Sequence, residues 1–141
     1  MQIALQKPLH QRILAQLEAA HPDEAGGFLL GTAAGDAVSI VDVVPIENIF
    51  TPEERYHRYA MTPQDWMRLE DQADARGLSL VGYYHSHPDS PAIPSVYDRD
   101  HALPHFVYLI TPIYAQGAGE MLAWHLDDDR AAFTSDTLSI V

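Results

Sequence analysis

Residues 78–98 place an apolar strand directly before two histidines and a proline-rich loop, which strongly limits the local fold. Residues 78–84 are mostly apolar or aromatic and predict a strand. His85 and His87 follow, and Pro88 helps to end the strand because it has no backbone donor. Side chains at positions i and i+2 of an extended segment point to one face, so the two imidazoles can converge on one point.

The loop after this strand leads to a short predicted helix. Pro91 and Pro94 lie within residues 89–94 and indicate an ordered loop. Ser95 is a good N-cap, and Asp98 then occupies the third helical position. The loop is therefore expected to bring a carboxylate from the first turn of a helix back towards the end of the strand.

These residue types suit one zinc ion per chain. Zinc takes nitrogen and oxygen ligands tetrahedrally, and a catalytic site uses three protein ligands and leaves the fourth position for water. His85, His87 and Asp98 supply three. A hydrolytic site also needs a carboxylate that is not a ligand, and Glu24 is the candidate.

The full spacing carries more weight than any part of it. With 8 histidines in 141 residues, random placement gives roughly 0.4 His-x-His pairs, whereas adding Ser and Asp at fixed offsets lowers the chance to roughly two in a thousand. Simpler readings stay open at this point. Ser95 and Asp98 could be a helix-capping pair only, and Glu24 could be a solvated residue just past the first helix.

The same residues resemble the signature of the JAMM (MPN-plus) family of zinc metalloproteases. That signature is a Glu, then His-x-His, seven residues, Ser, two residues and Asp. It is matched without a gap by Glu24, His85, His87, Ser95 and Asp98. Gly26 is a departure, because many members have Cys there, but that residue is not a zinc ligand.

The resemblance implies a zinc metallopeptidase or isopeptidase that hydrolyses the bond after the C-terminal tail of a ubiquitin-like or sulfur-carrier protein. Zinc would lower the pKa of its water, Glu24 would act as general base and then acid, and Ser95 would donate a hydrogen bond to the oxyanion. Ser86 would only position its neighbours. The alternatives are a non-catalytic MPN scaffold, whose typical members lack part of the ligand set, and a zinc hydrolase of a small amide. A homodimer is also compatible with the family.

Composition excludes other classes. The formal net charge is −12, and Lys7 is the single lysine, which argues against nucleic acid and against anionic membrane surfaces as partners. The chain has no cysteine, so disulfides, thiolate zinc ligands and the Cys-containing zinc site of deaminases are excluded. It shows neither a signal sequence nor an 18-residue apolar run, so we expect a cytoplasmic protein.

The rest of the chain predicts alternating helices and strands around one core. We expect helices at residues 9–20 and 62–77, and further strands at residues 27–32, 37–46, 106–111, 119–126 and 131–134. Residues 47–59 indicate a polar loop, either solvated or in contact with a substrate, and residues 127–130 a hairpin turn.

With 141 residues, of which 47% are hydrophobic, the chain fits one α+β domain spanning residues 1–141. We expect a mixed, mainly antiparallel sheet flanked by helices. The resemblance implies the α/β/α-like MPN fold, which is cytidine-deaminase-like.

Overall fold

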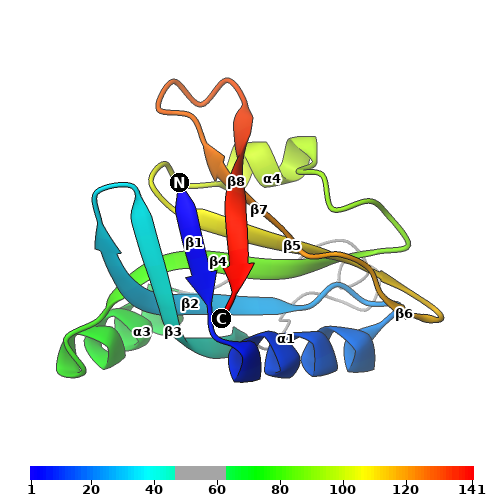
Figure 1. The fold of residues 1–141 in the computed structure, drawn as a ribbon, viewed down its shortest axis with the longest axis horizontal. Coiled ribbons are helices and arrows are strands. Elements are labelled where there is room, and N and C mark those ends of the chain that lie inside the picture. The colour runs from blue at the N-terminus through cyan, green and yellow to red at the C-terminus, as the bar shows by residue number, and fades with distance from the viewer. Residues whose placement is uncertain (47–62) are drawn as a thin grey trace.

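The computed structural model describes residues 1–46 and 63–141 (Figure 1). Its helices are α1 (Lys7–Ala20), α3 (Pro63–Ala75) and α4 (Val96–His101). Its strands are β1 (Gln2–Leu5), β2 (Gly26–Ala34), β3 (Ala37–Ile46), β4 (Ser79–Pro88), β5 (Val107–Tyr114), β6 (Gly117–Ala118), β7 (Leu122–Leu126) and β8 (Phe133–Ile140). Among the described residues, no helix is both long and apolar enough to cross a membrane.

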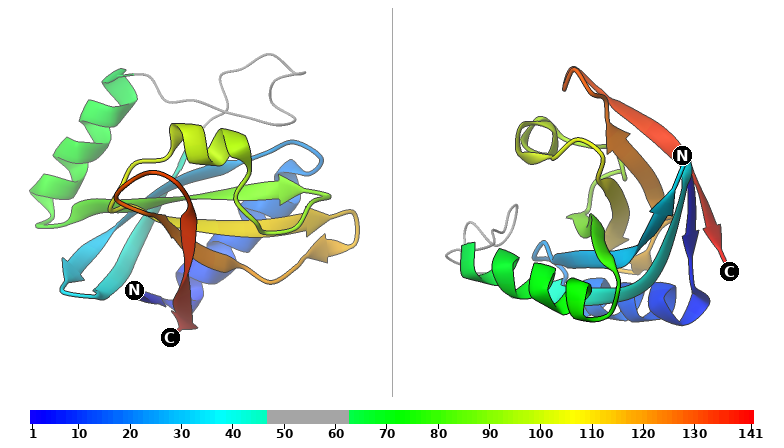
Figure 2. Two further views of the ribbon diagram at one scale, coloured as in Figure 1. Left: turned by 90° about the horizontal axis from the view of Figure 1, so that it is seen from above. Right: turned by 90° about the vertical axis from the view of Figure 1, so that its left-hand side faces the viewer.

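The strands form one sheet that closes on itself. Their order is β4-β2-β3-β1-β8-β7-β5-β6, and β4 also pairs with β5, which joins the two sides into a barrel-like wall. Five of the pairings are antiparallel, and β1–β3, β1–β8 and β4–β5 are parallel. The expected mixed, mainly antiparallel sheet is therefore confirmed, and Figure 2 shows how strongly it curves.

The helices lie on different sides of this curved sheet. Figure 1 shows α1 and α3 along one side and α4 on the opposite side. Leu9, Ile13 and Leu17 of α1 are buried at three- and four-residue spacing, as the sequence pattern predicts. They pack into the main core, whose strand residues include Ile3, Leu5, Leu29, Ile40, Val81, Leu109 and Ile113.

The second helix also follows its prediction. α3 packs against β4 and buries Leu69 and Ala73. It is followed by Gly77, whose φ of +68° is a left-handed conformation that glycine adopts without strain. The side chain of Trp66 is not described, so its expected inward orientation lies outside what the structure covers, as does the expected loop at residues 47–59.

Two strand predictions need correction. Residues 119–126 do not form one strand: β6 ends at Ala118, and β7 begins at Leu122. Between these two strands, the amide of Gly119 donates to the carbonyl of Pro112 at 2.8 Å. The last strand is longer than residues 131–134 and runs through Phe133–Ile140.

The N-terminal strand β1 was not predicted. Four residues are too few for a clear periodic signal, and its two neighbours come from distant parts of the sequence. β1 lies between β3 and β8 and pairs with both in parallel.

The strand that precedes the histidine pair is confirmed and extends through it. β4 ends at Pro88, so His85 and His87 lie near its C-terminal end. Both flanks of this strand end are occupied, by Gly26 of β2 opposite His85 and by Pro112 of β5 opposite His87. The two imidazoles therefore project from a rigid, doubly paired strand.

Candidate metal centre

The ends of β4 and α4 bring three ligand-type side chains together. His85 and His87 come from β4, and Asp98 comes from the first turn of α4. His85 Nε2 lies 3.2 Å from His87 Nε2 and 3.2 Å from Asp98 Oδ1, and His87 Nε2 lies 3.0 Å from Asp98 Oδ2. The convergence predicted from their spacing is confirmed.

These separations fit a metal ion. A tetrahedral zinc with ligands at 2.0–2.1 Å separates its donor atoms by about 3.3 Å. The three side chains each offer an atom within 4.8 Å of the others, close to that geometry. His85, His87 and Asp98 could therefore hold one metal ion, and the nitrogen and oxygen donors suit a divalent transition metal.

A backbone carbonyl sets the orientation of one imidazole. Nδ1 of His87 lies 2.7 Å from the carbonyl oxygen of Pro91, which can only accept a hydrogen bond. The ring therefore donates from Nδ1 and turns Nε2 towards Asp98, the arrangement that commonly orients metal-binding histidines. The sequence indicated an ordered loop here but not this contact, since a backbone acceptor leaves no residue-type signal.

Charge and burial act on two of these side chains in opposite ways. Burial raises the pKa of Asp98, but the nearby His85, the contacts with both imidazoles and the amide of Ser95 outweigh it and hold that pKa well below its usual range. Burial lowers the pKa of His87, yet its hydrogen bonds with Asp98 and Pro91 leave the net value raised. The carboxylate is thus kept ionised, as a metal ligand must be.

Ser95 and Asp98 do form a capping box. The amide of Asp98 donates to Ser95 Oγ at 3.0 Å, and the amide of Ser95 donates to Asp98 Oδ2 at 2.8 Å. The capping reading is therefore correct, and it does not exclude the metal reading, because the same contacts fix the carboxylate. Ser95 Oγ accepts from the helix and retains its own proton to donate.

Glu24 lies beside this cluster and is only 9% exposed, so it is not a solvated residue. It lines a cavity of about 370 Å³, whose other lining residues are His87, Pro88, Ser90, Pro91, Ile93, Ser95 and Asp98. Burial, reinforced by the negative charge of Asp98, raises the pKa of Glu24 to about 9. A buried carboxyl with a shifted pKa in a cleft is a candidate for acid–base chemistry.

Several contacts hold the segment that carries Glu24. Ser86 Oγ accepts from the amide of Ala25 at 3.0 Å, and Gln16 of α1 donates to the carbonyl of Gly26 at 2.9 Å. His21 Nε2 lies 3.0 Å from Asp89 Oδ1 and ties the start of the segment to the residues after β4. Sequence reasoning gave Ser86 a positioning role without its partner, and it missed the other two contacts.

Gly27 follows in the same segment and leaves no room for a side chain. A Cβ atom there would lie 2.3 Å from the carbonyl oxygen of Val44 and 2.6 Å from the hydroxyl of Tyr84. That hydroxyl donates to Gln16 Oε1 at 2.5 Å. Because Gly27 has no side chain, the Tyr84 hydroxyl can pass close to the start of β2 and reach Gln16 of α1.

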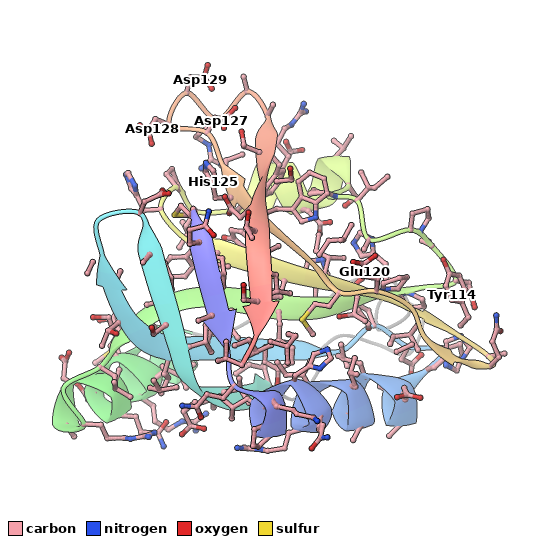
Figure 3. All side chains as sticks on the ribbon, in the orientation of Figure 1. Tyr114, Glu120, His125, Asp127, Asp128 and Asp129 are labelled. Carbon is pink, nitrogen blue, oxygen red and sulfur yellow. The ribbon has the colours of Figure 1, made fainter. Side chains whose placement is uncertain are left out.

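The acidic run after β7 takes no part in the cluster. Asp127, Asp128 and Asp129 lie at the tip of the β7–β8 connection, as Figure 3 shows. The amide of Asp127 donates to the carbonyl of Ala132 at 2.9 Å, which confirms the predicted turn. Within residues 1–46 and 63–141, the His-His-Asp group is the only group of three or more His, Asp or Glu side chains that could hold a metal ion.

The fold and site together define an α+β protein with a closed, barrel-like sheet, a His-His-Asp cluster that could hold a metal ion, and a buried glutamate beside it. Residues 6–127 match the family described as prokaryotic homologs of the JAB domain. The chain belongs to this family, which confirms the resemblance found in the sequence.

Two sequence relatives agree with this membership. The chain is 36% identical over 90 residues to the desampylase of Haloferax volcanii, a match that spans 63% of this chain and 62% of that protein's length. A stretch of 25 residues is 76% identical to an MPN domain-containing protein of Mus musculus and covers 18% of this chain and 5% of that protein.

Two solved structures share the fold. A protein from Desulfitobacterium hafniense has a TM-score of 0.83 at 26% identity, and the match covers 99% of this chain and 92% of that one. A protein from Salinibacter ruber has a TM-score of 0.73 at 33% identity, and the match covers 98% and 90% of the two chains. The sheet-rich α+β architecture is thus that of related proteins.

Proposed function

We propose that this protein is a zinc-dependent metallopeptidase that hydrolyses the bond after the C-terminal tail of a ubiquitin-like or sulfur-carrier protein. The observation that carries the proposal is the convergence of His85, His87 and Asp98 on one point, next to the buried Glu24. The desampylase among its relatives supports a hydrolase acting on ubiquitin-like conjugates. The assignment of residues 1–141 to one catalytic domain, with cytidine-deaminase-like layering, is part of the same proposal.

His85, His87 and Asp98 would hold the zinc, since they provide two imidazole nitrogens and one carboxylate oxygen. When bound, zinc would polarise the scissile carbonyl and lower the pKa of the water in its open position. The hydrogen bond from Nδ1 of His87 to the carbonyl of Pro91 supports this role, because it leaves Nε2 of the same ring available as a ligand.

Glu24 would accept the proton of the attacking water and pass it to the leaving amine. Its pKa of about 9 means that the carboxyl holds a proton at neutral pH in the chain alone. A divalent cation nearby favours the charged form and lowers that pKa, so loading the site would prepare Glu24 to act as a base. Burial then keeps the carboxylate from being solvated during the transfer.

Ser95 would donate a hydrogen bond to the oxyanion. Its side chain lines the cavity together with Glu24 and Asp98, and its oxygen is fixed by the amide of Asp98. A fixed donor aimed at developing charge costs no reorganisation when the charge forms, and each such donor contributes about 3–4 kcal/mol.

Extended substrates have room to reach this site. Ile93, which lines the cavity, and Val96, which follows Ser95, are 60% and 65% exposed, so the surface beside the cavity is apolar and open to solvent at these two residues. A protein tail could lie across such a surface, which supports the tail substrate over a small amide.

Zinc content and cleavage, measured together, test the proposal. Wild type, Glu24→Gln and the matched control Glu18→Gln, which makes the same change on the exposed side of α1, are each incubated with a ubiquitin-like protein bearing a C-terminal extension. We expect about one zinc in all three and cleavage after the tail in wild type and Glu18→Gln only. Wild type without zinc would refute the metal centre, and full cleavage by Glu24→Gln would remove Glu24 from its role.

A further inference from the structure

Side chains of β7 and of the turn after it hold the segment that carries Asp98 at two points. Arg130 lies in the β7–β8 turn and contacts the end of α4, while Trp124 of β7 contacts the loop that precedes α4. Neither residue lines the cavity, and neither belongs to the family signature.

Arg130 closes the C-terminal end of α4. Its guanidinium donates to the carbonyl of Ala102 at 2.8 Å and lies 3.4 Å and 3.5 Å from the carbonyls of Arg99 and Asp100. The last carbonyls of a helix have no partner within the helix, and a cation there also complements the helix dipole. A helix of 6 residues is far too short to be stable alone, so α4 depends on such contacts.

The turn is built to aim this side chain. Arg130 has a φ of +61°, and its amide donates to the carbonyl of Asp127 at 2.8 Å. The amide of Ala131 donates to Asp129 Oδ1 at 2.9 Å. Figure 3 shows the aspartates at the tip of this turn. Their place at the tip and their contacts with the turn backbone fit a role in shaping the turn.

Trp124 fixes the loop between two metal ligands. Its indole Nε1 donates to the carbonyl of Ala92 at 3.0 Å, and Ala92 is itself buried. Ala92 directly follows Pro91, whose carbonyl orients His87. The indole therefore restrains the backbone between the residue that orients His87 and the helix that carries Asp98.

An apolar cluster includes the residue that directly follows the same helix. Ala102, just past α4, is buried with Tyr108 and Leu126, and Trp124 packs at the edge of this group. The hydroxyl of Tyr108 accepts from the amide of Leu103 at 2.7 Å. The end of α4 is thus held by the Arg130 guanidinium from the β7–β8 turn, by the Tyr108 hydroxyl from β5 and by apolar packing.

From these contacts we propose that Arg130 and Trp124 are positioning residues for the metal centre, acting through α4 and its loop on Asp98. The inference rests on the proposed function, because it concerns the ligand geometry of the same cluster. Arg130 would hold the C-terminal end of α4 in place, and Trp124 would hold the backbone of the loop that precedes α4. Neither would touch the substrate or the metal.

Metal affinity and the visible spectrum of bound Co²⁺ test the proposal. The variants are Arg130→Ala, Arg130→Lys and Trp124→Phe, and the control is Arg76→Ala, which removes an exposed arginine that binds Asp42 at 2.5 Å, away from α4. We expect zinc affinity to fall about 10–100-fold in Arg130→Ala and Trp124→Phe, the usual scale for groups that orient ligands. Arg130→Lys should recover part of the loss, and Arg76→Ala should match wild type.

The cobalt spectrum reports geometry rather than folding, so a purely structural role would leave it unchanged. We expect altered intensity and position of the visible bands in Arg130→Ala and Trp124→Phe. If both variants bind zinc as Arg76→Ala does and give wild-type cobalt spectra, the positioning role is refuted while the metal centre stands. If Arg130→Ala does not fold, Trp124→Phe, which keeps most of the ring's volume, decides the question.

Amide hydrogen exchange on the chelator-treated proteins separates this inference from the proposed function. Arg130→Ala should speed exchange across residues 96–102 while the amides of β2 and β4 keep wild-type rates, and Arg76→Ala should not. This result would support the positioning role of Arg130 even if wild type bound no metal. Unchanged exchange across residues 96–102 in Arg130→Ala would overturn it.

Discussion

The hydroxyl of Ser86 is hydrogen bonded to the backbone of Ala25, so the middle residue of the His-Ser-His run holds the segment that carries Glu24. Ser86 Oγ accepts from the amide of Ala25 at 3.0 Å, and the Ser86 amide donates to the carbonyl of Ala25 at 2.9 Å. Ser86 is fully buried, with 0% exposure. One strand thus fixes the proposed base through Ser86 and two proposed ligands through its histidines.

Ser86→Ala should separate these two tasks. The change leaves the Ala25 amide without its side-chain acceptor, which should lower the free energy of unfolding by about 1–3 kcal/mol. Zinc stoichiometry should stay near wild type, because the ligands are untouched, whereas kcat should fall because Glu24 is less firmly held. Ser139→Ala on exposed β8 is the control. Loss of zinc in Ser86→Ala would show that it supports the ligands instead.

Asp98→Asn should distinguish metal binding from helix capping. An asparagine oxygen can still accept from the amide of Ser95, so α4 should keep its cap. The neutral amide is a much poorer metal ligand, so we expect zinc affinity, measured by competition with a chelating dye, to fall by at least about 100-fold. Asp100→Asn, on the same helix, should bind zinc like wild type. Equal affinities for both variants would contradict the ligand assignment.

Ser95 variants should show whether its hydroxyl acts beyond the cap. Ser95→Ala removes both the cap and the hydroxyl, while Ser95→Gly removes the hydroxyl at a capping cost of only a few tenths of a kcal/mol. If the hydroxyl stabilises the oxyanion, both variants should lose about 10²-fold in kcat with zinc retained, and Ser95→Thr should restore activity. Near-normal kcat in Ser95→Gly would leave Ser95 as a cap alone.

The raised pKa of Glu24 should make the chelator-treated protein less stable as the pH rises. Its pKa is 4.5 as an ordinary glutamate and about 9 in the fold, so between these values the folded chain holds a proton that the unfolded chain has released. The free energy of unfolding should therefore fall by about 1.4 kcal/mol per pH unit across that window. Below the window Glu24 is protonated in both the folded and the unfolded chain, so none of this stability has been lost.

Urea unfolding at pH 5 and pH 8 measures this slope. Glu24→Gln cannot ionise, so it should lack this part of the pH dependence and be more stable than wild type by a few kcal/mol at pH 8, with little difference at pH 5. Glu18→Gln should follow wild type. Parallel pH profiles for wild type and Glu24→Gln would show that Glu24 is not protonated in the folded chain.

The elements around the site could be predicted because their signals are local. The strand that runs into His85, the loop prolines and the Ser95 cap each depend on residues within a few positions of one another. The same holds for α1, whose buried stripe has helical spacing. The convergence of the three proposed ligands could be predicted from these elements, since a strand end and the first turn of a helix have known directions.

Other features could not be predicted because they depend on contacts between distant segments. The short strand β1 gains its hydrogen bonds only between β3 and β8, and the sheet closes only where β4 meets β5. The partner of Ser86 and the carbonyl that orients His87 are backbone groups, which every residue type presents alike.

By itself, the sequence determined the chemistry of this protein: which side chains could bind a metal ion, and on which strand and helix they lie. Tertiary structure alone decided what surrounds them. Glu24 becomes a buried carboxyl with a raised pKa only when the fold brings it beside the end of β4, the loop after it and α4, because desolvation depends on neighbours from distant parts of the chain. Arg130 and Trp124 likewise reach α4 and its loop only because the closed sheet brings β7 beside them.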